Sequence, residues 1–238
     1  MSQKHWAIGD VHGCGKTLEA LVNQIQPGKE DRITFLGDLI DRGSTHLRLF
    51  SLLEELMETC SIDVIRGNHE QAYLEALLEI PRKNWFGKVK RPLLEVWKSY
   101  GGETLLKEFG CALPEELPEF FVELVKQSVA YREVPEAFLV HAGFDFRSPN
   151  PFEDTHAMMW IRDFEVDLKI TGGKRVVHGH VPVSLELIEQ SLNHPKYGFV
   201  DIDNGCVYRD QPGMGNLIAL ELSSFSMVVQ ANQEPYYS

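Results

Sequence analysis

Three short clusters of acids, histidines and glycines contain the residues best suited to chemistry in this sequence. They read GDVHG at residues 9–13, GDLIDRG at 37–43 and RGNHE at 66–70, and they supply Asp10, His12, Asp38, Asp41, Asn68 and His69. Two later imidazoles are His141 in LVHAG and His180 in VHGHVP. Oxygen and imidazole donors without a thiolate suit Mn, Fe, Zn or Mg rather than a structural cysteine-zinc site. The residue types therefore predict a site for divalent cations.

Each cluster directly follows a short apolar run and precedes a segment with helical periodicity. HWAIGD is followed by LEALVNQI, ITFLGD by LRLFSLLEELM, and IDVIRGN by EQAYLEALLEI. This alternation predicts a β-α-β-α-β series whose strands end on one edge of a sheet. Ligands of open α/β sheets bind at that edge, so we expect the three clusters to converge there.

The stretch GDVHGCGKT, residues 9–17, also resembles the end of a phosphate-binding P-loop. That pattern needs a glycine at position 10, where backbone N–H groups approach the phosphate. Asp10 stands there and would instead place a carboxylate against the phosphate. The P-loop interpretation is therefore disfavoured, and Lys16 and Thr17 are predicted to begin an ordinary helix.

The remaining sequence predicts further elements around the first sheet. From Pro81 to about Gln127 it is rich in Trp, Pro, Lys and Glu and predicts a helical insertion. Past Val129, strand-like runs such as AFLVHAG, NLIALEL and FSMVVQ predict a second sheet. We expect one domain over residues 1–238, of the α/β class, with two central mixed sheets flanked by helices. The aromatic residues Trp85, Phe86 and Trp97 are interpreted as packing of the insertion rather than as a substrate groove.

Composition restricts the partners and the compartment. The net charge of −12 disfavours nonspecific binding to nucleic acid or to an anionic membrane. The four cysteines are far apart and form no C-x-x-C pair, which fits reduced thiols in a cytosol. MSQKHWAIGD has no apolar core of signal-peptide length, and no apolar run approaches the length of a membrane span. We therefore expect a cytoplasmic protein.

Taken together, the motifs resemble those of the phosphoprotein phosphatase family within the calcineurin-like metallophosphoesterases, in its bacterial and phage-type branch. The likeness covers roughly residues 5 to 205, with the three clusters in order and followed by the separate His-Ala and Gly-His elements. It implies an α/β/β/α sandwich. YGFVDIDNGCVY stands where eukaryotic members have a segment like S-A-P-N-Y-C, so their inhibitor and docking properties are not carried over.

The resemblance also implies a role for each matching residue. Asp10 and His12 would bind the first metal, Asp38 would bridge both metals, and Asn68, His141 and His180 would complete the second. His69 would act as general acid, oriented by Asp41. The phosphate would be held by Arg42, Arg66 and, from the shorter motif WIRDF, Arg162. His178, two residues before His180, remains an alternative ligand or a neighbour of the ligands.

These roles are chemically consistent with phosphoester hydrolysis. Two cations about 3.5–4 Å apart lower the pKa of a shared water, and the resulting hydroxide can attack phosphorus in line. The planar guanidinium of arginine binds phosphate oxygens in pairs. An imidazolium held by a carboxylate can protonate a poor leaving group. We expect two divalent ions, with Mn²⁺ first and Fe, Zn or Mg as alternatives.

The expected activity is hydrolysis of phosphomonoesters, with phosphoserine or phosphothreonine in protein as the favoured substrate. Phosphotyrosine and small phosphoesters are further options. A related branch hydrolyses dinucleoside polyphosphates such as diadenosine tetraphosphate, but there glutamine typically replaces His12, giving G-D-I-Q-G. A metal-bound interaction module without catalysis is a third alternative, and the complete residue set argues against it.

Overall fold

The computed structural model describes residues 3–83 and 85–236. Its first sheet has the strand order β10-β11-β1-β2-β3, with β12 paired to β11. The strands are β1 (His5–Ile8), β2 (Arg32–Phe35), β3 (Ser61–Val64), β10 (Asp203–Asn204), β11 (Asn216–Glu221) and β12 (Ser226–Ala231). Strands β1, β2 and β3 are parallel. The helices that follow them are α1 (Gly15–Ile25), α2 (His46–Thr59) and α3 (Asn68–Leu78), which confirms the predicted β-α-β-α-β series.

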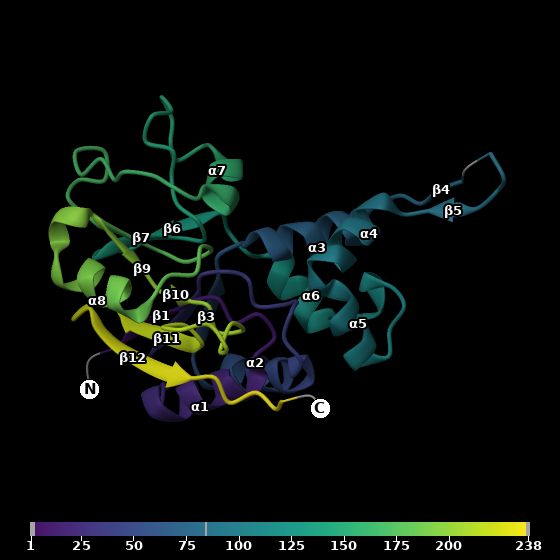
Figure 1. Cartoon of the computed structure of the whole chain (residues 1–238), viewed down its shortest axis with the longest axis horizontal. Helices are drawn as coiled ribbons and strands as arrows, with labels where there is room; N and C mark the ends of the chain where they lie inside the picture. The colour runs from purple at the N-terminus through teal and green to yellow at the C-terminus, as the bar shows by residue number, and fades with distance from the viewer. Residues whose placement is uncertain (1–2, 84, 237–238) are drawn as a thin grey trace.

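The second sheet has the strand order β6-β7-β8-β9. Its strands are β6 (Tyr131–Glu133), β7 (Ala137–Val140), β8 (Arg175–His178) and β9 (Phe199–Asp201). Because β7, β8 and β9 are parallel, their C-terminal ends also share one edge. Helices α7 (Thr155–Trp160) and α8 (Leu185–Asn193) and the 3₁₀ turn η3 (Pro195–Tyr197) belong to this half of the chain. Figure 1 shows the two sheets together with the helices around them, and this mixed α/β architecture confirms the expected fold class.

The last strands differ from the sequence expectation, because β10, β11 and β12 join the first sheet and not the second. Strand β11 pairs with β1 in antiparallel orientation. Its residues 217–220 are all buried, as in a central strand covered on both faces. Such a pattern predicts a buried strand but contains no information about its neighbours.

Alternating side chains of the strands build the cores on either side of the first sheet. In β1, Trp6 and Ile8 belong to the core beneath α1 and α2, whereas Ala7 faces the second sheet. Ala7 and Leu220 of the first sheet share an apolar cluster with Val177 and Val200 of the second. The sheets therefore pack face to face through alternate residues.

The insertion is helical as expected but begins with a β-hairpin. Its elements are β4 (Arg82–Lys83), β5 (Val89–Lys90), α4 (Pro92–Trp97), the π-helical turn η1 (Lys98–Gly102), α5 (Glu103–Phe109), η2 (Pro114–Glu116) and α6 (Glu119–Lys126). The hairpin projects away from the rest of the molecule in Figure 1, and Trp85 on it is 96% exposed. Trp97, by contrast, is fully buried and shares the core of the first sheet with Phe121. Because of this shared core, we propose that the insertion belongs to the same domain.

Two further observations bear on the compartment. Within the described ranges, no helix combines the length and the apolar character needed to cross a membrane. Cys14, Cys60, Cys111 and Cys206 are all free thiols.

Candidate active site

Asp38 lies at the centre of the predicted site. Its Oδ2 is 3.6 Å from His12 Nε2, and its Oδ1 is 3.4 Å from His141 Nε2. The structure contains two sets of converging donor atoms, and Asp38 belongs to both: His12, Asp38 and His69 form one, and Asp38, His141 and His180 form the other. This arrangement suits a carboxylate shared by two cations.

The histidines of the two sets are oriented by backbone carbonyl groups. His12 Nδ1 donates to the carbonyl oxygen of Ile40 at 3.2 Å, and His141 Nδ1 donates to that of Leu36 at 2.8 Å. These bonds leave Nε2 of each ring as the lone-pair donor. His141 Nε2 lies 3.0 Å from Asn68 Oδ1, so the predicted amide ligand faces the same point.

Asp10 and His180 carry buried polar atoms that make no hydrogen bond in the described chain. Asp10 Oδ1 accepts a hydrogen bond from the backbone N–H of His180 at 3.3 Å, whereas Asp10 Oδ2 and His180 Nε2 have no partner. Buried polar atoms normally have partners. A divalent cation beside each atom would satisfy it, and the oxygen and imidazole donors around the two atoms fit such ions. Asp10 itself lies outside the two sets of converging donors.

The electrostatics of the donors favour bound cations. Burial, together with the neighbouring Asp203 and Asp38, raises the pKa of Asp10 well above its usual value. Burial also opposes ionisation of Asp38, but the nearby imidazoles of His141, His69 and His12 hold the Asp38 pKa below its usual value. Positive charge at this point would relieve the repulsion between the carboxylates.

Burial lowers the pKa values of the histidines predicted as ligands. This holds for His12 and His141, and the pKa of His180 falls to about 3. These rings are therefore neutral near pH 7, which is the form that binds metals.

Left-handed backbone conformations aim several of these side chains. Among the described residues, seven non-glycine residues have positive φ, and five of these are predicted site residues: His12, Asp38, Asp41, Arg42 and His180. Such strain persists only where neighbours impose it. Glu70, the last residue of RGNHE, does so by accepting hydrogen bonds from the backbone N–H groups of Asp38, Leu39 and Gly67 at 2.7, 2.8 and 3.1 Å. The sequence interpretation assigned no role to Glu70, although it lies inside the motif.

Asp41 and His69 form a buried pair, as predicted. His69 Nδ1 donates to Asp41 Oδ2 at 2.7 Å, and neither side chain is more than 1% exposed. Burial alone would lower the His69 pKa, but the carboxylates of Asp38 and Asp41 raise it above its usual value. A carboxylate that holds Nδ1 leaves Nε2 free to give a proton to a leaving group.

The motifs and their geometry agree with one known family. A family model described as calcineurin-like phosphoesterase matches residues 4–207. The chain belongs to this family. It is a phosphoesterase family, so membership supports a hydrolase with a divalent-cation site built from these histidines and aspartates.

Individual relatives within the family have names that state different activities. The asymmetrical bis(5′-nucleosyl)-tetraphosphatase PrpE of Halalkalibacterium halodurans is 27% identical over 97% of this chain and 95% of its own length. Serine/threonine-protein phosphatase 1 of Salmonella typhimurium is 39% identical, but over only 30% of this chain and 32% of its own. A solved structure with the provisional name diadenosine tetraphosphatase has a TM-score of 0.63 and 17% identity, and the match covers 96% of this chain and 93% of that one.

Within this family member, the three predicted phosphate-binding arginines occupy different settings. Arg42 reaches the centre, where its guanidinium nitrogens lie 3.1 Å from His12 Nε2 and 3.0 Å from His69 Nε2. Arg66 directs Nε and Nη2 to the hydroxyl and carbonyl oxygens of Ser128 at 2.9 and 2.8 Å, so part of its guanidinium is already engaged. Arg162 is exposed after α7, and its charge contributes to lowering the pKa of His180.

Replacing Arg42 by lysine is expected to lower kcat/KM roughly 10- to 100-fold, because an ammonium cannot reproduce paired bonds to phosphate that are worth about 1.5–3 kcal/mol. Steady-state hydrolysis of p-nitrophenyl phosphate measures this change. Arg48→Lys is the matched control, because Arg48 pairs with Glu19 and Glu55 on the surface. Unchanged kinetics in Arg42→Lys would remove Arg42 from the phosphate site.

Trp97 connects the insertion to the Asp41–His69 pair. Its indole N–H donates to Asp41 Oδ1 at 3.2 Å, while the other carboxylate oxygen holds His69. A Cβ atom on Gly102 would lie only 2.4 Å from the Trp97 ring, so glycine is required beside it. The sequence interpretation assigned Trp97 to packing alone. The indole N–H of a buried tryptophan normally has such a partner.

Trp97→Phe is expected to reduce kcat roughly tenfold for substrates with poor leaving groups. This is the effect expected when one hydrogen bond to a charged group, here the Asp41 carboxylate, is lost. Trp85→Phe is the matched control, because Trp85 is 96% exposed. Turnover and the melting temperature are measured for both variants. A lower melting temperature with unaltered turnover would mean that Trp97 contributes only packing.

His178 does not belong to either set of converging donors in the described chain. Its ring is buried, and Nδ1 donates to the carbonyl oxygen of Gly179 at 3.1 Å. Burial lowers its pKa to about 4. Of the two alternatives in the sequence, this geometry favours a neighbour of the ligands.

Proposed function

We propose that this protein hydrolyses dinucleoside polyphosphates, with two divalent cations at the Asp38 centre. The observation that carries the proposal is the extent of similarity, because PrpE proteins from two organisms match 97% and 96% of the chain. The proposal departs from the protein-phosphatase expectation, which rested on the resemblance of the motifs and used His12 to argue against the dinucleotide-hydrolysing branch. His12 is a weaker discriminator than similarity over the whole chain.

The predicted donors would divide between two cations. Asp10 and His12 would hold one, Asn68, His141 and His180 the other, and Asp38 would contact both. Bound divalent ions supply an activated water and neutralise charge that develops on the phosphate oxygens. We propose Mn²⁺ first, with Fe, Zn or Mg as alternatives, because such donor sets accept several ions.

The chain's own residues would then orient the substrate and move a proton. Arg42, with Arg66 and Arg162, would bind phosphate oxygens and so position the phosphorus. His69 would protonate the oxygen that leaves, and Asp41 would hold its ring in place. The arginines would act on a phosphoanhydride as well as on a phosphomonoester, whereas the proton from His69 would matter mainly for the poorer leaving group of the ester.

Protein phosphoserine or phosphothreonine is the second candidate substrate. The 39% identity with the Salmonella typhimurium phosphatase over 72 residues favours it. That match covers less than a third of either chain, whereas the PrpE match spans both chains almost fully. We also propose a cytoplasmic location, from the reduced cysteines expected above.

The experiment compares diadenosine tetraphosphate with a phosphoserine peptide as substrates for the metal-stripped protein after Mn²⁺ is restored. We expect faster turnover of the dinucleotide and no turnover before Mn²⁺ is added. Chromatography of the products distinguishes off-centre cleavage, which gives ATP and AMP, from central cleavage, which gives ADP alone. Faster turnover of the peptide would transfer the assignment to the second candidate.

A further inference from the structure

A hollow of about 240 Å³ lies at the C-terminal edge of the second sheet, beside the predicted metal centre. The lining residues nearest in sequence to the predicted ligands are Ala142, His178 and Val181. They neighbour His141 and His180 along the chain. Arg162, a predicted phosphate-binding residue, lines the hollow as well. The hollow is therefore adjacent to the expected position of the substrate phosphate.

Apolar and aromatic side chains form most of its walls. They are Ile161, Phe164, Val181, Val183, Leu187 and Phe199. The ring of His178 packs against two of these aromatics, with its centroid 5.1 Å from that of Phe164 and 5.6 Å from that of Phe199. The volume is below the roughly 300–1,000 Å³ of sites that enclose drug-sized ligands. The hollow therefore suits a flat ring system rather than a whole nucleotide.

Two polar side chains, His178 and Asp201, line the hollow as well. His178 donates through Nδ1 to the carbonyl oxygen of Gly179, so Nε2 remains an acceptor. Asp201 accepts from the backbone N–H of Asp203 through Oδ1, and its Oδ2 lies 4.0 Å from His178 Nδ1. N–H donors on the edge of a ligand would find hydrogen-bond acceptors in these two side chains.

We propose that this hollow binds one nucleobase of the dinucleotide substrate. The inference rests on the proposed function and on off-centre cleavage, the kind stated in the names of the PrpE relatives, because such cleavage breaks a bond close to one of the two nucleosides. Attack at either phosphorus of that bond leaves this nucleoside no more than one phosphate away from the metal centre. Adenine and guanine both present N–H donors on their edges, and their faces stack on aromatic rings.

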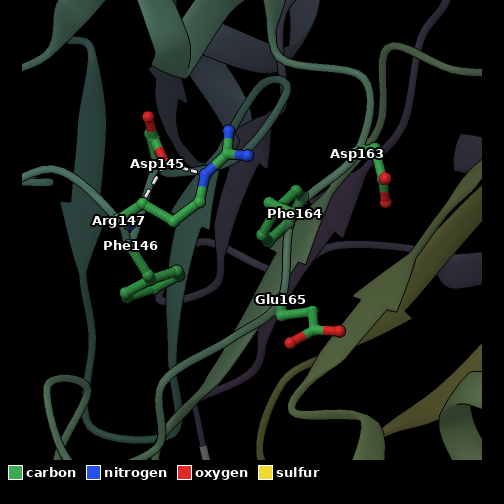
Figure 2. A pocket seen from close by; sticks show the side chains of 6 residues that line it. All are labelled: Asp145, Phe146, Arg147, Asp163, Phe164 and Glu165. Carbon is green, nitrogen blue, oxygen red and sulfur yellow. Dashed lines mark hydrogen bonds and ion pairs between the residues drawn. The ribbon is translucent and has the colours of Figure 1, made fainter.

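A second hollow, of about 230 Å³, shares Asp163 and Phe164 with the first, and Figure 2 shows the residues that line it. Its lining includes three carboxylates, Asp145, Asp163 and Glu165, and only one cation, Arg147. Arg147 is already paired with Asp145 at 2.9 Å, as the dashed line in Figure 2 shows. The first hollow shares Asp163, but its lining has two carboxylates, Asp163 and Asp201, beside the one cation Arg162. Because the second hollow is the more negative of the two, the base is assigned to the first.

Competition between two ligands that differ only by the base tests the assignment. Adenosine 5′-phosphate and ribose 5-phosphate are used as inhibitors of p-nitrophenyl phosphate hydrolysis with Mn²⁺ present. We expect the adenosine compound to bind roughly tenfold more tightly, since stacking of one base contributes about 1–3 kcal/mol. Equal inhibition constants in the unmodified protein would overturn the proposal without any variant.

Leu187→Trp then locates the base. Leu187 lies on α8 at the hollow and is 39% exposed, so a larger side chain can fill the hollow from the surface. We expect the ratio of the two inhibition constants to fall close to one. Leu47→Trp, at a position 54% exposed on α2, is the matched control and should keep the tenfold ratio. A ratio that survives in Leu187→Trp would place the base elsewhere and overturn the proposal.

Turnover of diadenosine tetraphosphate decides the proposed function separately. A protein that prefers adenosine 5′-phosphate as inhibitor but does not hydrolyse the dinucleotide would retain the base site and lose the proposed activity. A protein that hydrolyses the dinucleotide with equal inhibition constants would retain the activity and lose the base site.

Discussion

Asp38→Asn is expected to lower turnover of every phosphoester on the order of a thousandfold. The variant removes the charge that we propose two cations share, and these cations would together contribute several kcal/mol to the transition state. Asparagine preserves the size of the side chain and an oxygen that can accept the His69 backbone N–H, which lies 3.2 Å from Asp38 Oδ1. The fold should therefore survive while the charge is lost.

Activity with added Mn²⁺ and the amount of bound metal are measured together for this variant. Asp210→Asn, at an exposed position, is the matched control and should retain both. Full activity with normal metal content in Asp38→Asn would exclude the bridging role. A loss of secondary structure would instead assign the effect to folding, and circular dichroism detects it.

His69→Asn is expected to slow hydrolysis of a phosphoserine peptide roughly 10²- to 10⁴-fold, the usual contribution of a general acid. Hydrolysis of p-nitrophenyl phosphate should fall much less, because its leaving group departs without a proton. Leaving phosphate groups of a dinucleotide resemble the aryl case, so diadenosine tetraphosphate should also be affected weakly. The measurement is the ratio of kcat/KM between the peptide and the aryl ester.

The same variant separates two roles that the geometry allows for His69. Its Nε2 lies 3.8 Å from Asp38 Oδ2, and His69 belongs to one set of converging donors. An equal loss for all substrates, with less bound metal, would make His69 a ligand and contradict the general-acid role. His194→Asn, at an exposed position, is the matched control.

The first half of the fold and the residue types of the site could be predicted from the sequence, because both depend on short segments of the chain. A short apolar run followed by glycine and a polar cluster dictates a strand, a tight turn and a helix, and parallel strands then end together. Asp10, Asp38 and Asn68 therefore had to approach one another. The polar composition of their clusters already indicated divalent cations.

Only the tertiary structure determined the contacts between segments that are distant in the sequence. The hydrogen bond from Trp97 to Asp41 joins positions 56 residues apart. The sequence of α4 indicates that Trp97 is buried, but it does not indicate which residue Trp97 contacts. The pairing of β11 with β1 and the hollow between His178, Phe199 and Leu187 likewise depend on how the two sheets pack. A local sequence pattern indicates whether a side chain is buried. The residues that this side chain contacts depend on how the entire chain packs.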